Sequence, residues 1–292
     1  KVKEMKKIGF IGLGKMGLPM ALCLCRKGFS VWTCSSKEES QRSVEEAGGH
    51  GAPDYAWMAA ECDVLISIVP ADREILELAQ VVEDRGREGL VWIEMTSAMG
   101  TTKQAVARSL EHKGIRLMDA PVSGGTAGAR KGELTIMAGA CGTLLEEHRD
   151  ILEGMGTRIF HTGGVGSASN VKMLNQMLNA ANTAIAAEVL CLSRKLGVDD
   201  EVLSRVVNQS SGGSYIFERN VPKYMMTGDH TPGFRLDLMK KDVGLFTETA
   251  KEKDSFFPVS GLIAELYKAA SHRGFGDQNY TAIHKWYEEN ED

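Results

Sequence analysis

The sequence predicts an α/β fold class: a doubly wound parallel sheet domain, then an all-α domain, joined by one long interdomain helix. Short apolar segments alternate with helical segments over the first 162 residues, which is typical of a parallel sheet covered by helices. From Ser167 to Leu196 the chain has neither glycine nor proline, and its apolar residues recur at helical spacing. We therefore expect a sheet domain over 1–162 and a helical domain over 163–292, with the long helix at about 167–196.

The expected elements follow from local pattern. The strands are short apolar runs bounded by turn residues, and the helices between them carry apolar residues on one face. The expected strands are 7–11, 30–33, 64–69, 90–95, 115–119, 134–139 and 158–161, and the expected helices include 18–25, 73–83 and 103–112. The long helix would extend about 45 Å at 1.5 Å per residue.

A glycine motif joins the first strand to the first helix. Gly12 would permit a tight turn, Gly14 would leave room for a pyrophosphate, and Gly17 would allow close packing of helix and strand. The helix N-terminus then offers N–H groups to the phosphates. The pattern predicts a Rossmann-type dinucleotide site rather than a glycine-rich turn used only for packing, with cofactor-binding residues Gly12, Leu13, Gly14, Lys15, Met16 and Gly17.

The turn after the second strand bears on the choice of cofactor. NAD sites usually carry an acidic residue there, about 20 residues beyond the glycines, to bind the ribose 2′-hydroxyl. This chain has Ser35, Ser36 and Lys37 instead, and a 2′-phosphate would find donors with no carboxylate to repel it. The loop therefore favours NADP(H), with NAD(H) possible.

Composition excludes several other classes of protein. The 292 residues have a net charge of -5 and no basic block, so neither nucleic acid nor an anionic membrane is an expected partner. No apolar run approaches about 18 residues and no secretory leader precedes the first strand, so we expect a cytoplasmic protein. Six scattered cysteines and seven histidines show no metal-ligand spacing, so reduced thiols and no metal are expected.

Two further groups of residues could carry chemistry. One face of the long helix carries Lys172, Asn175, Gln176 and Asn179. On this face Lys172 is either a cleft-facing acid/base group with polar neighbours or an ordinary lysine in a solvated turn. The loop from Asp119 to Gly128 follows a predicted strand, where ligands of an open parallel sheet bind. In that loop Ser123, Gly124 and Gly125 offer a hydroxyl and bare N–H groups that suit a carboxylate, although the same residues also make a good generic loop.

Together these segments resemble the β-hydroxyacid dehydrogenase family, which is related to 6-phosphogluconate dehydrogenase. The resemblance rests on the opening glycine motif, the loop from Asp119 to Gly128, residues 166–176 and the run 240–245. It implies a hydride exchange between NAD(P) and a small acid that bears a hydroxyl or the corresponding aldehyde. Candidate compounds are those of 3-hydroxyisobutyrate dehydrogenases, tartronate semialdehyde reductases and glyoxylate or succinic semialdehyde reductases, methylmalonate semialdehyde, and sulfonated or longer hydroxyacids.

The resemblance also assigns roles to residues. It makes Lys172 the acid/base lysine, places the substrate carboxylate at Ser123, Gly124 and Gly125, and gives Asn175 or Gln176 the task of orienting the substrate. Its cofactor contacts are Val69, Pro70, Thr96 and Lys241. Two positions depart from the family pattern: Gly100 stands where many members have proline, which would loosen the loop after Ser97, and Gln176 stands where several have asparagine.

The expected mechanism needs one proton transfer beside the hydride transfer. A protonated Lys172 would donate to the forming alkoxide in reduction, and a neutral one would accept the hydroxyl proton in oxidation; desolvation should lower the pKa of this lysine toward working pH. Two alternatives stay open, an imine reductase of the same fold and a non-catalytic nucleotide-binding scaffold. The glycine-free helix and the family both favour a homodimer or homotetramer.

Overall fold

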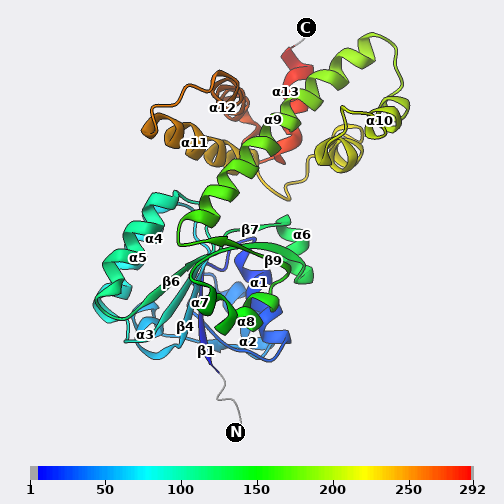
Figure 1. Ribbon diagram of the computed structural model, residues 1–292. Helices are drawn as coiled ribbons and strands as arrows, with labels where there is room; N and C mark the ends of the chain where they lie inside the picture. The colour runs from blue at the N-terminus through cyan, green and yellow to red at the C-terminus, as the bar shows by residue number, and fades with distance from the viewer. Residues whose placement is uncertain (1–5, 291–292) are drawn as a thin grey trace. The chain divides into compact units, whose positions relative to one another are not determined.

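The computed structural model describes residues 6–290, and the chain divides into two compact units between Lys172 and Met173 (Figure 1). The first unit holds the sheet. Within its described residues, nine strands form one sheet in the order β3-β2-β1-β4-β5-β6-β8-β7, and β9 pairs with β8. The strands are β1 Lys7–Ile11, β2 Ser30–Thr33, β3 His50–Gly51, β4 Val64–Ser67, β5 Val91–Glu94, β6 Arg116–Asp119, β7 Val122–Ser123, β8 Leu134–Gly139 and β9 Gly156–Gly163.

Six neighbouring strands, from β3 to β6, run parallel, which confirms the predicted doubly wound arrangement. Their register places the last residues of three strands side by side: Ser67 pairs with Glu94, and Glu94 pairs with Asp119. The carboxyl ends of β4, β5 and β6 therefore meet at one edge of the sheet. The loops after these strands are brought together there.

The far end of the sheet differs from an all-parallel prediction. Strand β8 runs antiparallel to both β6 and β7, while β9 runs parallel to β8. A parallel neighbour needs a crossover of a dozen or more residues. Between β7 and β8 the chain has only the short helix α6, Gly125–Lys131, and its turns, so it returns in the opposite direction.

Helices cover both faces of the sheet because successive strand residues point to opposite sides. Val64 and Ile66 pack in one core with residues of α1, Gly17–Arg26, and α6, whereas Leu65 packs in another with residues of α3, Tyr55–Glu61. The second core also holds residues of α4, Asp72–Arg85, and α5, Gly100–Glu111. The remaining helices of this unit are α2 Glu38–Glu46, α7 Gly142–Glu147 and α8 Arg149–Glu153.

The second unit is helical, as predicted. It contains most of α9, Ser167–Lys195, whose glycine-free sequence forms one unbroken helix. Its core gathers residues such as Ala184, Tyr267 and Ile283 from α9, α12 and α13. The other elements are α10 Asp200–Asn208, η1 Ile216–Met225, α11 Leu236–Glu252, α12 Pro258–Ala270, η2 Ser271–Phe275, η3 Tyr280–Ala282 and α13 Ile283–Asn290.

Much of the apolar face of α9 that the helical spacing indicated is exposed. Leu178, Leu192 and Leu196 are 66%, 58% and 70% exposed, whereas the buried face carries Met177, Ala180 and further alanines. Across the described residues, no helix combines the length and apolar character that crossing a bilayer requires.

Candidate active site

The predicted cofactor residues lie at the carboxyl ends of adjacent strands. The glycine loop follows β1, Val69 and Pro70 follow β4, and Thr96 follows β5, in the sheet order β1-β4-β5. Two of them are in contact, since the Val69 N–H donates to the Thr96 hydroxyl at 2.9 Å. These residues therefore lie along one edge of the sheet.

Each glycine of the loop has a different structural reason. Gly12 has a φ of +98°, and a Cβ there would lie 2.1 Å from the Ile68 carbonyl oxygen. A Cβ on Gly17 would lie 1.8 Å from the Gly12 carbonyl oxygen, so only a residue without a side chain lets the start of α1 lie this close to the turn. A Cβ on Gly14 would meet no atom within 4 Å. Gly12 and Gly17 thus serve the fold, while Gly14 leaves space beside the loop.

The loop fits the pyrophosphate of a dinucleotide. The open side of Gly14 lies directly before α1, whose first turn has no acidic residue and whose Met16 N-cap makes no side-chain hydrogen bond to it. A helix start of this kind attracts an anion through its N–H groups and dipole. In the same loop Leu13 is buried and Lys15 is exposed.

The loop after β2 is open to solvent. Ser36 and Lys37 are exposed, Ser35 is half-buried, and the Lys37 N–H donates to the Ser35 hydroxyl at 3.1 Å. Lys37 is also the N-cap residue of α2. The acidic residues Glu38 and Glu39 belong to the first turn of that helix and not to the loop.

Ser123, Gly124 and Gly125 form the turn from β7 into α6. Gly124 is the N-cap of that helix with a φ of +132°, and Gly125 begins it with a φ of +60°. A Cβ on Gly125 would contact nothing within 4 Å, whereas one on Gly124 would lie 3.1 Å from the Leu134 side chain. The backbone here favours glycine at both positions and leaves the Gly125 side open.

The predicted polar face of α9 separates into buried and exposed residues. Lys172 is only 7% exposed and Gln176 only 3%, while Asn175 is exposed. Asn175 donates to the Gln176 side-chain oxygen at 3.3 Å, and Gln176 Nε2 donates to Asp242 Oδ2 at 2.8 Å. Lys172 is the last residue of the first unit, and the amide residues belong to the second.

Lys241, the predicted cofactor lysine, lies on α11 beside Asp242. Its ammonium is 3.2 Å from Asp242 Oδ1, and the Asp242 side chain is 3% exposed. Asp242 therefore connects Lys241 with Gln176. Asp242 belongs to the run 240–245, but its sequence position alone indicates no role, because only the fold brings Asp242 against Gln176.

Gly100 contradicts the expectation of a loosened loop. A Cβ there would lie 2.6 Å from the Asn170 side chain and 2.7 Å from the Gly166 carbonyl oxygen. A Cβ on Gly166, which has a φ of +89°, would in turn lie 2.8 Å from the Gly100 carbonyl oxygen. Two glycines thus allow the starts of α5 and α9 to pack closely, and the loop is tight.

One group near this edge was missed by sequence reasoning. Glu94, Lys103 and Asp119 are all completely buried and in contact. A signal existed, because Lys103 shares the apolar face of its helix with Met99, Val106 and Leu110 at helical spacing. A lysine on such a face needs a buried partner.

The sheet, the glycine loop and the helical unit define a dinucleotide-dependent oxidoreductase. A family model described as the NAD binding domain of 6-phosphogluconate dehydrogenase matches residues 7–163, more than half of the chain. A second, described as NAD-binding of NADP-dependent 3-hydroxyisobutyrate dehydrogenase, matches residues 166–287. The chain belongs to the β-hydroxyacid dehydrogenase family and is an NAD(P)-dependent hydroxyacid dehydrogenase.

Several named relatives match along nearly the whole chain. The 2-(hydroxymethyl)glutarate dehydrogenase of Eubacterium barkeri is 34% identical over 97% of this chain and 95% of its own length. The L-threonate dehydrogenase of Cupriavidus necator is 32% identical over 96% and 95%. The NAD-dependent L-serine dehydrogenase of Pseudomonas aeruginosa is 31% identical over 97% and 98%.

Solved structures agree with this assignment. The 3-hydroxyisobutyrate dehydrogenase of Mycobacterium tuberculosis, solved with L-serine, has a TM-score of 0.91 at 28% identity, covering 97% of this chain and 99% of that one. An imine reductase of Myxococcus stipitatus has a TM-score of 0.64 at 17% identity, covering 97% and 99%, and at that identity shares the fold alone.

Proposed function

We propose that this enzyme interconverts a small hydroxyacid and its aldehyde or keto acid, with Lys172 as the acid/base group. The observation that carries the proposal is the burial of Lys172, which is 7% exposed in the second turn of α9. The family resemblance assigns the acid/base lysine to the same position. The acids in the relatives' names share a hydroxyl on the carbon β to a carboxylate. A 3-hydroxycarboxylate is therefore the substrate class we favour.

The proposed proton transfer needs only Lys172. The nicotinamide, when bound, accepts or donates the hydride. In oxidation a neutral Lys172 takes the proton of the substrate hydroxyl, and in reduction its ammonium returns a proton to the same oxygen. The presence of a lysine at this position favours a hydroxyacid dehydrogenase over an imine reductase of the same fold.

The substrate carboxylate is proposed to bind the turn from β7 into α6. Ser123 supplies a hydroxyl, and Gly124 and Gly125 supply N–H groups at a turn that their positive φ values reserve for glycine. Asn175, which is exposed, would orient the substrate, and Gln176, bound to the buried Asp242, would hold Asn175 in place.

For the cofactor we propose NADP(H) ahead of NAD(H). The support is the loop after β2, where Ser35, Ser36 and Lys37 offer donors and no carboxylate. Ser35→Asp places a negative charge where a 2′-phosphate would bind, so kcat/KM with NADPH should fall at least about tenfold while that with NADH falls less. A wild type that prefers NADH, or a variant with unchanged NADPH use, would contradict this.

We also propose that the enzyme is a homodimer or homotetramer. Apolar residues along α9 and just past its end, among them Leu178, Leu192 and Leu196, are exposed, and exposed apolar surface on one helix face is typical of an interaction site. A cytoplasmic location is consistent with this proposal and remains a prediction.

A substrate panel tests the proposed reaction directly. The purified enzyme is assayed with NAD⁺ and NADP⁺ against 3-hydroxyisobutyrate, L-serine, L-threonate and 2-(hydroxymethyl)glutarate, and with NADPH against a cyclic imine. We expect cofactor reduction with at least one acid and no imine reduction. Imine reduction without acid oxidation would support the reductase alternative, and inactivity in every assay would support the scaffold alternative.

A further inference from the structure

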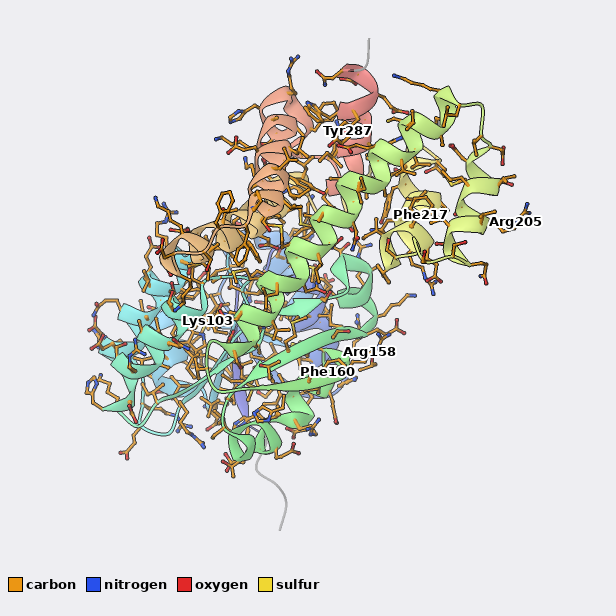
Figure 2. The ribbon with its side chains drawn as sticks, turned by 45° about the horizontal axis from the view of Figure 1, so that its top comes forward. Lys103, Arg158, Phe160, Arg205, Phe217 and Tyr287 are labelled. Atoms are coloured by element: carbon orange, nitrogen blue, oxygen red, sulfur yellow. The ribbon has the colours of Figure 1, made fainter. Side chains whose placement is uncertain are left out.

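We propose that Lys103 is a positioning residue: through Glu94 it fixes the Thr96 hydroxyl as an acceptor toward the cofactor, and through Asp119 it fixes the first turn of α9, which carries Lys172. Lys103 lies on α5 within the first unit and is labelled in Figure 2. The proposal rests on the proposed function for the role of Lys172. Its first half requires that the protein binds a dinucleotide in contact with Thr96, and it does not depend on the substrate.

The ammonium of Lys103 is enclosed by three acceptors from the ends of two neighbouring strands, β5 and β6. It lies 2.7 Å from Glu94 Oε2, 2.8 Å from Asp119 Oδ1 and 2.7 Å from the Thr96 carbonyl oxygen. Glu94 and Asp119 are paired residues at the ends of β5 and β6, so sheet register places their carboxylates around one cation. All three side chains are completely buried.

Glu94 acts on the Thr96 hydroxyl. Thr96 Oγ1 donates to Glu94 Oε1, and the Thr96 N–H donates to the same carboxylate at 3.1 Å. The Val69 N–H donates to Thr96 Oγ1 at 2.9 Å. A hydroxyl has one proton and two lone pairs, so Thr96 has only an acceptor lone pair left. It can therefore accept a hydrogen bond from a cofactor hydroxyl or amide and cannot donate one.

Asp119 acts on the start of α9. Its Oδ2 accepts the Ser169 N–H at 2.8 Å, and its Oδ1 accepts the Ser169 hydroxyl at 2.8 Å. The carboxylate thus satisfies an N–H in the first turn of a helix, a role usually played by a local cap. Lys172 follows three residues later, about 4.5 Å along the axis. A shift of this turn would move Lys172 with it.

The contact of α5 with the start of α9 also helps to hold the first turn of α9 in place. Gly100 and Gly166 approach so closely that neither could carry a Cβ, and Gln104 Nε2 donates to the Val165 carbonyl oxygen at 3.1 Å. Lys103 lies between Gly100 and Gln104 in sequence. The helix that supplies the ammonium is therefore packed against the segment that leads into α9.

The electrostatics favour an intact cluster. Burial alone would lower the pKa of Lys103, but the Glu94 and Asp119 carboxylates outweigh it and raise that pKa. Burial also raises the pKa of Glu94, against the opposing effects of Lys103 and Thr96. The partners of Glu94 here, Lys103, Thr96 and the Ser67 hydroxyl, all donate to it, as an ionised carboxylate requires. Removing one partner of such a group leaves a buried charge uncompensated.

The role of Glu94 in orienting the Thr96 hydroxyl is tested by measuring cofactor affinity without substrate. In Glu94→Gln the amide nitrogen faces either Lys103 or Thr96, which opposes the ammonium or turns the Thr96 proton outward. We expect the Kd for NADPH, measured by nucleotide fluorescence, to rise at least about tenfold. Glu147→Gln, which alters a surface ion pair with Arg116, is the matched control and should keep the wild-type Kd. This result does not depend on which substrate the enzyme uses.

The role of Asp119 in holding the first turn of α9 is tested by a pair of serine variants. Ser169→Ala removes the hydroxyl that contacts Asp119. Ser167→Ala removes a hydroxyl from the same helix turn that contacts Thr162 of β9 at 2.8 Å. We expect kcat with the best panel substrate to fall about tenfold in the first and less than twofold in the second. The Kd for NADPH and the Tm should stay near wild type in both.

The link through Lys103 is tested by combining Glu94→Gln with Ser169→Ala in one double variant. The direct variant Lys103→Met is unsuitable, because it leaves two buried carboxylates without their cation and can fail to fold. If one ammonium couples them, the losses of kcat/KM in Glu94→Gln and Ser169→Ala will not multiply, and the double variant will differ from their product at least threefold. Multiplicative losses would overturn the link. Equal kcat in the two serine variants would overturn the role of Asp119, and unchanged cofactor affinity in Glu94→Gln would overturn the role of Glu94.

Discussion

The sharpest test of the glycine loop compares Gly14→Val with Gly17→Ala. The Gly14 position has no atom within 4 Å of an added Cβ and no positive φ, so the larger substitution should leave the unliganded fold intact. The smaller one at Gly17 forces a Cβ to within 1.8 Å of the Gly12 carbonyl oxygen. The two variants therefore separate cofactor binding from stability.

The magnitudes follow from ordinary packing and linkage energies. Overpacking costs about 1–3 kcal/mol, and for a unit of this size each kcal/mol lowers Tm by about 2–4 °C, so Gly17→Ala should lower Tm by about 2–12 °C. Gly14→Val should stay within about 2 °C of wild type without cofactor. With cofactor at 100 times the wild-type Kd, wild type gains about 2.7 kcal/mol, and a tenfold weaker variant gains only about 1.4 kcal/mol.

The assay is a thermal melt with and without NADPH, accompanied by a direct measurement of Kd. We expect Gly14→Val to show the wild-type Tm alone and at most about half of the cofactor-induced shift. If Gly14→Val melts as early as Gly17→Ala without cofactor, the open space beside Gly14 is not real. If it binds NADPH as wild type does, the pyrophosphate does not lie there.

Three further predictions concern the substrate turn, the thiols and the assembly. Gly124→Val should raise KM for a hydroxyacid at least about tenfold with little change in cofactor Kd, since it adds bulk at a φ of +132°, and equal changes in both would make the turn structural. Cys141 is exposed, and its hydrogen bond with Thr143 lowers the pKa of its thiol, whereas burial raises the pKa of Cys62 to about 12. A thiol reagent at pH 7.5 should therefore label Cys141 first. A Cys141→Ser variant that keeps the fast phase of labelling would contradict this. Leu192→Glu should lower the mass found by sedimentation, because it charges the exposed apolar face of α9, and an unchanged assembly would exclude that surface.

The sequence predicted the strands and the long helix well because local pattern controls them. The run 64–69 forms β4 as Val64–Ser67, and the run 167–196 forms α9 as Ser167–Lys195. The direction of β8 was not visible in the pattern, since an apolar strand has the same sequence whichever way it pairs. Helical spacing likewise identified the apolar face that carries Leu178 and Leu192, but it does not indicate whether the chain's own core or a second copy covers that face.

The candidate site divides in the same way. The glycine loop could be located because its residues are contiguous, and their φ values and close approaches follow from one turn. Lys103 could not be assigned a role, because its partners Glu94 and Asp119 come from two other segments and meet only through sheet register. The partnership of Gln176 with Asp242 likewise depends on the packing of α11 against α9.

The most direct test of the account is the turnover of Lys172→Ala with the best substrate of the panel. We expect kcat to fall at least about 100-fold, the low end for general acid/base catalysis, while the Kd for the cofactor changes less than about twofold. Lys195→Ala, which removes an exposed lysine from the end of the same helix, should keep wild-type kcat. Wild-type turnover in Lys172→Ala would show that the proton is carried by another group.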